Sequence, residues 1–326
     1  MILSIDIGGT FIKFARLTEN YAMQASWSID TFALTDSTLF YDSLVANMGN
    51  LQDVKQIAIC LPGIVSDTYD VLSKASPRVR SLYDTNVAHE ITKRTGLAVF
   101  ACNDAYAAAM GEFHFGSLKN TSSSFTYIIG TAVGGCFMIG DSIQKGTDNY
   151  AANISMMPLS FNEDKPIWTY TRCSASALYH RYHAYSKRPL PSAKAIIEAA
   201  EINDDAAHVV DQWIADIAHS LLQVSIHITR NISQLVVVFR ITHALCNALS
   251  TLILKSCNSI SIHHHSVQKL YDFKIHNMHI CLVLLIWPIR KKQRQKFDVV
   301  FICMRIQRFV MDLRLTLFSL GLLAYL

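Results

Sequence analysis

The sequence predicts an α/β protein with two domains, and one observation supports the fold class while another supports the number of domains. Short β-rich runs that end in glycine turns alternate with stretches whose apolar residues have helical spacing. The chain has 326 residues, of which 51% are hydrophobic, so it is long enough for two domains and a sizeable core.

The character of the chain changes at residue 240. Up to Phe239 there are 17 Lys and Arg against 22 Asp and Glu, and after it 12 against 3, so the net charge changes from −5 to +9. Twelve of the 13 glycines precede residue 240, and only Gly321 follows it. Tight turns of an α/β domain need glycine because they require positive φ. We therefore expect residues 240–326 to differ from the fold before them.

Several functional classes are not expected. The eight cysteines form neither a zinc-type C-x-x-C arrangement nor a disulfide framework, and no basic leader precedes the first apolar residues. The apolar run from Ile280 to Ile289 is about half of what spans a bilayer. We expect a cytoplasmic protein that binds neither membranes nor nucleic acid.

The first elements follow in order. "ILSIDI" and "FIKFARL" predict two strands of a hairpin with "GGT" at its tip. Residues 55–60 predict a strand stopped by Pro62-Gly63, residues 84–95 a helix closed by Gly96, and residues 97–102 a short buried strand.

The later elements begin with an alanine-rich helix from Asp104. "FTYIIG" predicts a strand, "TAVGG" a glycine turn, and "CFMIGDSIQKG" a strand, a turn and a second strand. Residues 205–231 have helical spacing and are expected to pack on a core sheet. Five apolar residues at 235–239 then predict a buried strand.

Two glycine-rich loops are candidates for phosphate binding. "DIGGT" at 6–10 and "GTAVGG" at 130–135 each combine glycines with a threonine next to a strand, so backbone N–H groups could point at a phosphate. A Gly-Gly hairpin tip is usually only a turn, but two such loops could hold a polyphosphate from two sides. Neither is a Walker loop, because no G-K-[ST] follows.

"CNDA" at 102–105 places two polar residues where a buried strand meets a helix. Asp104 is a candidate helix N-cap, which is the commoner role by base rate. It is also a candidate general base that accepts a proton from a hydroxyl, as phosphoryl transfer requires. Both roles are compatible if the start of the helix opens onto a cleft.

Four motifs together resemble the sugar kinases of the ROK (repressor, open reading frame, kinase) family. They are "SIDIGGT", "CLPGIVS", "NDAYAAAMGE" and "IIGTAVGG", in the family's order. The resemblance implies two ribonuclease-H-like (actin-like ATPase) domains, with ATP and a sugar in the cleft between them. The expected domains are residues 1–113 and 114–239, the second incomplete, followed by an atypical tail at 240–326. The chain begins directly at the first strand, so the resemblance points to the kinases rather than to the repressors.

The resemblance also implies roles for individual residues. It makes Asp104 the catalytic base and places Asp6 near Mg²⁺, and it suggests a structural role for Glu112. The expected sugar contacts are Gly63, Asn103, Asp104 and Asn153. The expected phosphate-loop residues are Gly8, Gly9, Thr10, Gly130, Thr131, Gly134 and Gly135.

The chain departs from the family pattern in two places before residue 240. Many members have a Glu that holds the sugar and a His that binds zinc, where this chain has Asn153 and Met156. Asn can still form a hydrogen bond with a hydroxyl, but without charge. The family's zinc cysteines are reduced to Cys173, so we expect neither a structural zinc nor any other metal site in the protein itself.

The third departure is the segment after Phe239. The family has glycines there, against the adenosine side of the nucleotide, whereas this chain has "FRIT". Later in the chain, the histidines at 263–265 predict a solvated loop, and the basic run 290–296 predicts a solvated face. The apolar end of the chain is not expected to be a membrane helix. Our hypothesis is that an insertion or deletion near codon 240 put the tail out of frame.

The predicted function is ATP-dependent phosphorylation of a hydroxyl of a hexose or glycoside, as by glucokinases, fructokinases or β-glucoside kinases, with Mg²⁺. The alternative is an inactive remnant with at most weak sugar binding, and an acetate- or glycerol-type kinase fits the motifs less well. ROK kinases are often homodimers, which extends to this chain as an expectation. The sequence does not identify the sugar.

Overall fold

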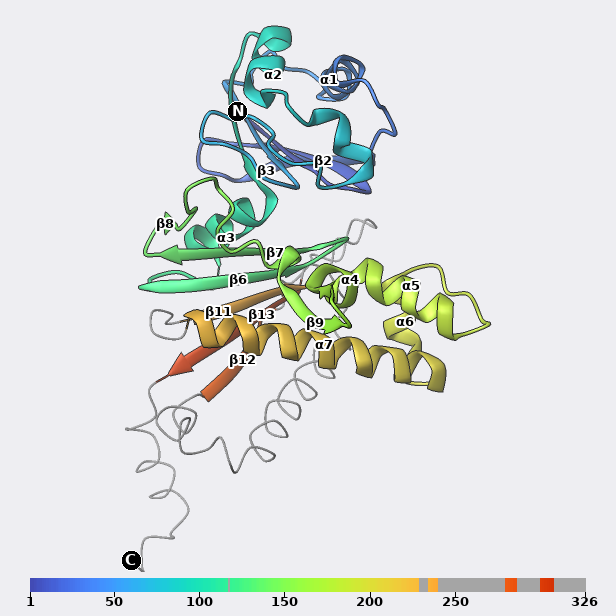
Figure 1. Cartoon of the computed structure of the whole chain (residues 1–326). Coiled ribbons are helices and arrows are strands. Elements are labelled where there is room, and N and C mark those ends of the chain that lie inside the picture. Colours follow the sequence, from blue (N-terminus) through green and yellow to red (C-terminus); the bar gives the residue numbers. More distant parts are fainter. Residues whose placement is uncertain (117, 229–233, 240–278, 286–299, 308–326) are drawn as a thin grey trace, which may run out of the picture. The chain divides into compact units, whose positions relative to one another are not determined.

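Two sheets organise the structure, which is a computed structural model that describes residues 1–116, 118–228, 234–239, 279–285 and 300–307 (Figure 1). The chain divides into two compact units. The first holds residues 1–114, 135–137 and 141–153, and the second holds the described residues within 115–134, 138–140 and 154–307. The architecture confirms the predicted mixed α/β fold class.

The first sheet has five strands in the order β3-β2-β1-β4-β5. β1 (Ile2–Ile7) pairs antiparallel with β2 (Phe11–Leu17), and β2 pairs antiparallel with β3 (Met23–Asp30). β1 is parallel to β4 (Gln56–Leu61), and β4 is parallel to β5 (Ala98–Asn103). The predicted hairpin and both following strands are confirmed.

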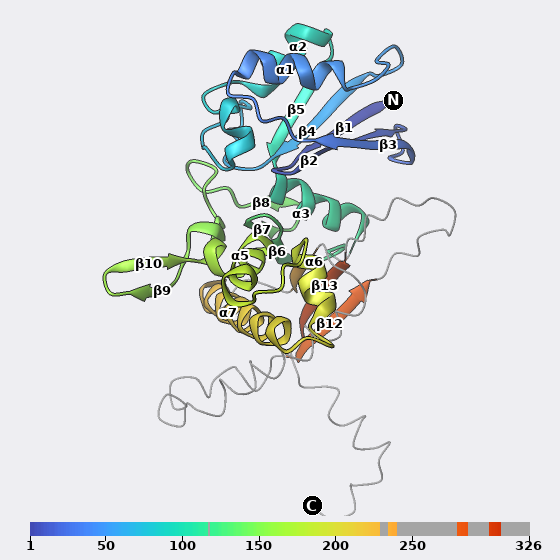
Figure 2. The ribbon, with the colours of Figure 1, turned by 90° about the vertical axis from the view of Figure 1, so that its right-hand side faces the viewer.

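The core of the first unit lies where this sheet meets α1 (Ser37–Ala46) and α2 (Val87–Thr95), as Figure 2 shows. α1 begins where the Asp36 side chain accepts a hydrogen bond from the Leu39 N–H (2.8 Å), and it buries Phe40 and Leu44. α2 ends at Gly96, whose φ of 72° is the left-handed conformation that glycine adopts without strain. The 3₁₀ turn η1 (Pro77–Leu82) and the helix α3 (Asp104–Phe115) complete this part of the chain.

The second sheet has the order β12-β13-β11-β6-β7-β8. Its strands are β6 (Ser123–Ile129), β7 (Val133–Ile139), β8 (Ser142–Ile143), β11 (Gln234–Phe239), β12 (His279–Leu285) and β13 (Val300–Gln307). β11 pairs parallel with β6, so the strand predicted at 235–239 is confirmed at the centre of this sheet.

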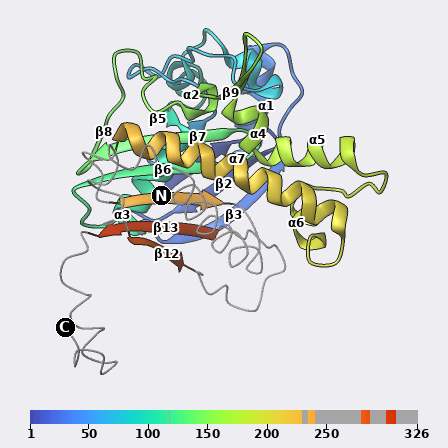
Figure 3. The same ribbon diagram turned by 60° about the horizontal axis from the view of Figure 1, so that its bottom comes forward.

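The long helix α7 (Asp204–Ile228) lies along the second sheet (Figure 3). The Tyr127 hydroxyl on β6 donates to the Ser220 hydroxyl on α7 (3.0 Å), and Trp213 is fully buried. The indole N–H of Trp213 donates to the carbonyls of Cys173 and Ser174, each at 3.0 Å. These contacts fix α7 against α4 (Thr169–Cys173) and α5 (Ala175–Tyr185). Also present are η2 (Ile154–Met156), the hairpin of β9 (Pro158–Asn162) and β10 (Lys165–Trp168), and α6 (Ala193–Ala199).

The two sheets differ at one corresponding position. In the first sheet β4 is followed by the parallel strand β5, whereas in the second sheet β11 is followed by β13, which runs antiparallel to it. The apolar run from Ile280 is a strand, β12, over its first part. The predictions for residues 240–278, the histidines at 263–265, the basic run 290–296 and the apolar end fall outside the described residues. None of the described helices is both long and apolar enough to cross a bilayer.

Candidate active site

Asp104 is the first residue of α3, and the side chain that caps this helix belongs to its neighbour. The Asn103 Oδ1 accepts hydrogen bonds from the backbone N–H groups of Ala105 (2.9 Å) and Tyr106 (3.3 Å). Asp104 Oδ1 accepts from the Ala105 N–H as well (2.9 Å), but it stands within the helix. Of the two candidate roles of Asp104, that of the N-cap is therefore filled by Asn103.

The amide nitrogen of Asn103 is also fully used. Its Nδ2 donates to the carbonyl oxygen of Gly63 (2.7 Å) and to Oδ1 of Asp104 (2.9 Å). An Asn side chain has two donor hydrogens and two acceptor lone pairs, and all four are occupied here. Asn103 thus ties the start of α3 to the loop after β4 and orients the carboxylate of Asp104.

The backbone of Gly63, whose carbonyl accepts this hydrogen bond, has a conformation that only glycine tolerates well. Its φ is 98°, and a Cβ built on it would lie 2.5 Å from Ser73 Oγ and 2.9 Å from the Cβ of Ala75. Ser73 Oγ accepts a hydrogen bond from the Ile64 N–H (2.8 Å), so it is held in place. The predicted sugar-binding residues Gly63, Asn103 and Asp104 are therefore brought together in the first unit.

The pKa of Asp104 is raised to about 6. The main cause is loss of water around the carboxylate, and the negative charge of Asp6 adds to it, whereas hydrogen bonds from Ala105 and Asn103 lower the pKa. Asp104 nonetheless keeps an exposed surface, so water still reaches the carboxylate and the desolvation is partial. A carboxylate with this pKa is mostly ionised at neutral pH and can accept a proton.

Asp6, expected near Mg²⁺, is paired with Lys13, which was not among the predicted site residues. The Lys13 ammonium contacts Asp6 Oδ2, and the thiol of Cys60 lies 3.7 Å from Asp6 Oδ1. Asp6 and Lys13 are directly opposite in the β1–β2 register, so counting residues back from the hairpin tip would have found the pair. Burial, followed by the charge of Asp6, raises the pKa of Cys60 well above its usual value, so this thiol stays protonated.

At the tip of the β1–β2 hairpin, one of the three expected phosphate donors is already used. The Gly8 N–H donates to the Phe11 carbonyl (2.9 Å), and a Cβ at Gly8 would lie 2.7 Å from that oxygen. The Gly8 N–H therefore closes the hairpin, and the expected role of Gly8 in the phosphate loop stays a prediction. Within the described chain no hydrogen bond engages the N–H groups of Gly9 and Thr10, so these two donors fit a phosphate.

Asn153 belongs to the first unit although it follows strands of the second sheet. Residues 141–153 are fastened to the first unit by Lys145, whose ammonium contacts Asp67, and by Asn149, whose Nδ2 donates to the Val65 carbonyl (3.0 Å). The Asn153 N–H donates to the Tyr150 carbonyl (3.3 Å). The predicted sugar contacts thus share one unit.

The turn between β6 and β7 is shorter than expected. Gly130 and Thr131 lie in the turn, but Gly134 and Gly135 lie inside β7, so the prediction that all four glycine-loop residues form a turn is wrong. The Gly130 carbonyl accepts a hydrogen bond from the Ala175 N–H at the start of α5 (2.9 Å). Gly134 and Gly135 lie in a strand because β7 is hydrogen-bonded to its neighbouring strands in the sheet. The local sequence does not show this pairing.

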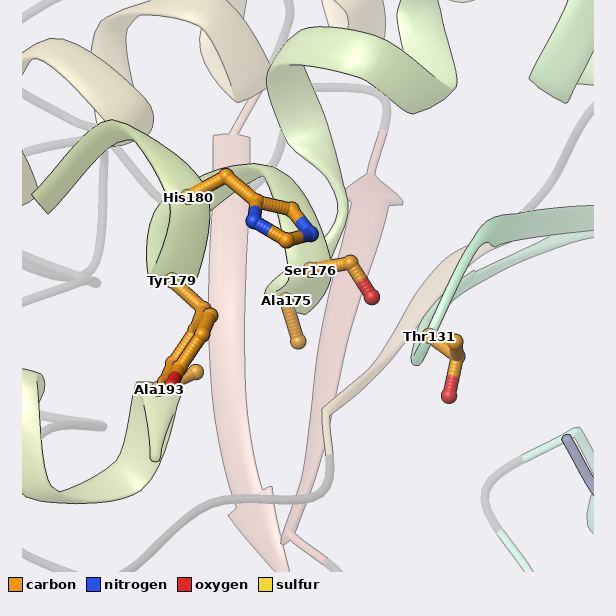
Figure 4. A pocket seen from close by; sticks show the side chains of 6 residues that line it. All are labelled: Thr131, Ala175, Ser176, Tyr179, His180 and Ala193. Carbon is orange, nitrogen blue, oxygen red and sulfur yellow. The ribbon is translucent and has the colours of Figure 1, made fainter. Parts of the chain in front are cut away.

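A pocket of about 210 Å³ adjoins this turn in the second unit. Figure 4 shows Ser176 and His180 extending towards the side of the pocket that carries Thr131, while the Tyr179 ring extends towards Ala193. The remaining lining residue is Ala175. Of these, only Thr131 was predicted, because α5 lies more than forty residues further along the chain and no motif marks it.

The part of the chain that the structure describes contains no cluster of three or more His, Cys, Asp or Glu side chains able to hold a metal ion. Cys173 is buried under α7, and burial, with a further effect from Asp216, raises its pKa to about 12. Glu112, for which a structural role is expected, is buried within α3, with 7% of its surface exposed.

A model of the ROK family matches residues 2–263, which is most of the chain and extends beyond Phe239. The N-acetylmannosamine kinase of Vibrio vulnificus is 32% identical over 164 residues, which is 49% of this chain and 55% of that protein. An uncharacterized protein of Clostridium perfringens is 28% identical over 53% of this chain and 58% of its own length. The chain thus spans a little over half the length of these curated relatives.

Solved structures share the fold at low identity. A ROK family glucokinase from Streptomyces griseus in complex with glucose and AMPPNP has a TM-score of 0.65 at 21% identity, covering 78% of this chain and 88% of that chain. A ROK family transcriptional regulator has a TM-score of 0.63 at 19% identity, covering 79% and 68%. The family therefore includes both sugar kinases and repressors. Since the family match covers most of the sequence, the chain belongs to the ROK family.

Proposed function

We propose that this protein is an ATP-dependent sugar kinase that phosphorylates a hydroxyl of a hexose or glycoside. The observation that carries this proposal is Asp104, an accessible carboxylate with a pKa of about 6, held at the start of α3 by Asn103. A general base works best when its pKa lies near the working pH, because it is then ionised and still accepts a proton readily. Glucokinase and N-acetylmannosamine kinase relatives support the same activity.

The chain's own residues would contribute as follows. Asp104 would accept the proton of the sugar hydroxyl while that oxygen forms a bond to the γ-phosphorus of ATP, the bond from that phosphorus to the bridging oxygen breaks, and ADP leaves. The N–H groups of Gly9 and Thr10, in the first unit, bind phosphate oxygens, and Thr131 does so in the second unit. Gly63 and Asn153 contact the sugar. Lys13 holds Oδ2 of Asp6, so a role for Asp6 at Mg²⁺ falls to Oδ1 unless that ion pair opens.

ATP and Mg²⁺ are the expected donor and metal. When bound to the nucleotide, Mg²⁺ supplies charge neutralisation on the phosphates. The β1–β2 tip fits the phosphates rather than the metal, because the N–H groups of Gly9 and Thr10 have no hydrogen-bond partner among the described residues. The remaining expectations, a cytoplasmic homodimer without a structural zinc, belong to the same proposal.

The same proposal assigns residues 1–113 and 114–239 to the two ribonuclease-H-like domains and treats 240–326 as an atypical tail. The scarcity of glycine after residue 239 supports the out-of-frame hypothesis, whereas the family match runs past codon 240 to residue 263 and does not mark that seam. Translating the gene downstream of codon 239 in the other two frames tests it. The hypothesis fails if neither frame gives Gly-Gly followed by family-like sequence.

The second candidate is an inactive remnant of a kinase. It is favoured by the antiparallel β13, which stands at the position where the first sheet has the parallel strand β5. A coupled ADP-release assay over hexoses and β-glucosides, with Asp104→Asn as the control, separates the two candidates. Activity that Asp104→Asn abolishes supports the kinase. Activity that survives in the variant overturns the assignment of the base, and no activity on any sugar favours the remnant.

A further inference from the structure

Thr31, the residue after β3, supports the tip of the β1–β2 hairpin from one side. Its N–H donates to the Thr10 carbonyl (2.9 Å), and its hydroxyl donates to the Gly8 carbonyl (2.7 Å). The residue is only 3% exposed, so water competes little for these hydrogen bonds. Thr31 therefore holds the backbone on both sides of Gly9, and the N–H groups of Gly9 and Thr10 are the donors that we assign to phosphate.

Arg78, in the 3₁₀ turn η1, holds Thr31 in turn. Its Nη1 donates to the Thr31 carbonyl (3.0 Å), and a guanidinium group donates in a fixed plane, so this contact orients the Thr31 peptide. The turn that carries Arg78 is itself fixed, because Val79 and Leu82 are buried. Arg78 is exposed, and within the described residues its side chain makes no other hydrogen bond and no ion pair. The contact with Thr31 is thus the polar interaction that the described fold gives this side chain.

The segment that carries Arg78 is anchored at its other end beside the expected sugar contacts. The Leu72 N–H donates to the Ile64 carbonyl (2.8 Å), and the Ser73 hydroxyl accepts from the Ile64 N–H (2.8 Å). A Cβ built on Gly63 would lie 2.5 Å from the Ser73 Oγ, so the segment packs directly against this glycine. One short stretch of chain therefore connects the loop at Gly63 with the support of the hairpin tip, and both lie in the first unit.

The hairpin tip needs such support because of its own sequence. Gly8 and Gly9 stand side by side, and glycine has more backbone conformations open to it than any other residue. Phosphoryl transfer depends on how exactly the phosphate donors are placed, and a shift of about 1 Å can cost a large factor in rate. A tip with two glycines does not fix its N–H groups by itself, so contacts from outside the hairpin must do this.

We infer that Arg78 and Thr31 are positioning residues, which hold the β1–β2 tip in the conformation that binds the phosphates of the donor. Arg78 acts on the tip through the Thr31 peptide, and Thr31 acts through its N–H and its hydroxyl. The inference rests on the proposed kinase function and adds two residues to it. Both lie outside the four motifs on which the sequence resemblance depends.

The test is pyrophosphate binding to the full chain, measured by isothermal titration calorimetry, together with KM for ATP and for the best sugar. Arg78→Ala should raise the Kd of pyrophosphate roughly three- to tenfold, because the tip loses its outer support. Thr31→Val keeps the shape but lacks the hydroxyl and should raise the Kd roughly two- to fivefold, whereas Thr31→Ser should restore it. KM for ATP should follow the same order, and KM for the sugar should stay unchanged. Arg80→Ala is the matched control, because Arg80 is exposed in the same turn but its side chain makes no hydrogen bond or ion pair among the described residues.

The outcomes separate this inference from the proposed function. Unchanged pyrophosphate binding in Arg78→Ala and Thr31→Val overturns the inference even if the protein phosphorylates sugars, and so does a wild type that binds no pyrophosphate. A loss in Arg78→Ala alone means that Arg78 acts by its charge, which refutes the positioning role. The expected losses in a protein without kinase activity support the positioning role and count against the function. Circular dichroism melting of each variant shows whether a loss comes from unfolding.

Discussion

Replacing Asn103 tests whether this residue positions Asp104 or contacts the sugar. Asn103→Ala removes the cap of α3, worth about 1 kcal/mol, and the hydrogen bond to the Gly63 carbonyl, worth about 1 kcal/mol more. The free energy of unfolding of the first unit should fall by about 2 kcal/mol. Asn103→Ser keeps an oxygen for the helix N–H groups but cannot reach Gly63, so it should recover about half of the loss.

The same change should move the pH dependence of catalysis. The hydrogen bond from Asn103 lowers the pKa of Asp104, so its removal raises that pKa above about 6. The acid limb of the kcat/KM profile should therefore shift to higher pH in both variants, because the base must be ionised to act.

The measurements are urea unfolding followed by circular dichroism, and kcat/KM for the best sugar between pH 5 and 9. A positioning residue should lower stability and shift the acid limb, with a modest change in KM for the sugar. If Asn103→Ala leaves stability and the pH profile unchanged while KM for the sugar rises strongly, Asn103 is a sugar contact. The hydrogen bonds described above would then rearrange when the sugar binds.

Three further predictions follow from single contacts. Asp104→Asn should raise the free energy of unfolding at pH 7.5 by about 1 kcal/mol, a value reduced for solvent exposure, and should leave it unchanged below pH 3.8. The reason is that the pKa of the carboxyl group is higher in the folded protein than in the unfolded chain, so its ionisation lowers stability as pH rises from 3.8 to about 6. Urea titrations at pH 3.5 and 7.5 check this. Gly63→Ala should lower the free energy of unfolding by about 2–3 kcal/mol, because the new Cβ meets both a positive φ and the Ser73 side chain. Gly96→Ala should lower it by only about 1 kcal/mol, because Gly96 has a positive φ but open space around it. Thermal melts of the two variants measure the difference. Trp213→Phe should destabilise the second unit by about 2 kcal/mol, since two carbonyls lose their shared donor; a melt unchanged from wild type would contradict the packing described for α7.

The sequence predicted most of the strands that bury one face, and it missed those that do not. β3 is mostly exposed and lacks an apolar run, so no periodicity marked it. The roles of Asn103 and Asp104 could not be separated, because both residue types cap helices and only the backbone geometry shows which side chain reaches the N–H groups. Tyr179 and His180 were missed because they line a pocket with Thr131 only after the chain folds, when α5 comes to lie beside the β6–β7 turn, and no local pattern shows this.

The return of residues 141–153 to the first unit has a consequence for the order of synthesis. On a ribosome, residues 1–114 emerge first, but Asp67 and the Val65 carbonyl meet Lys145 and Asn149 only after a further stretch of chain. At about 5–20 residues per second, this delay is about 2–8 s. During that time the loop that follows Gly63 lacks its partners. A chain truncated after residue 114 would keep this unfinished state permanently, whereas one ending at residue 153 would contain every segment of the unit.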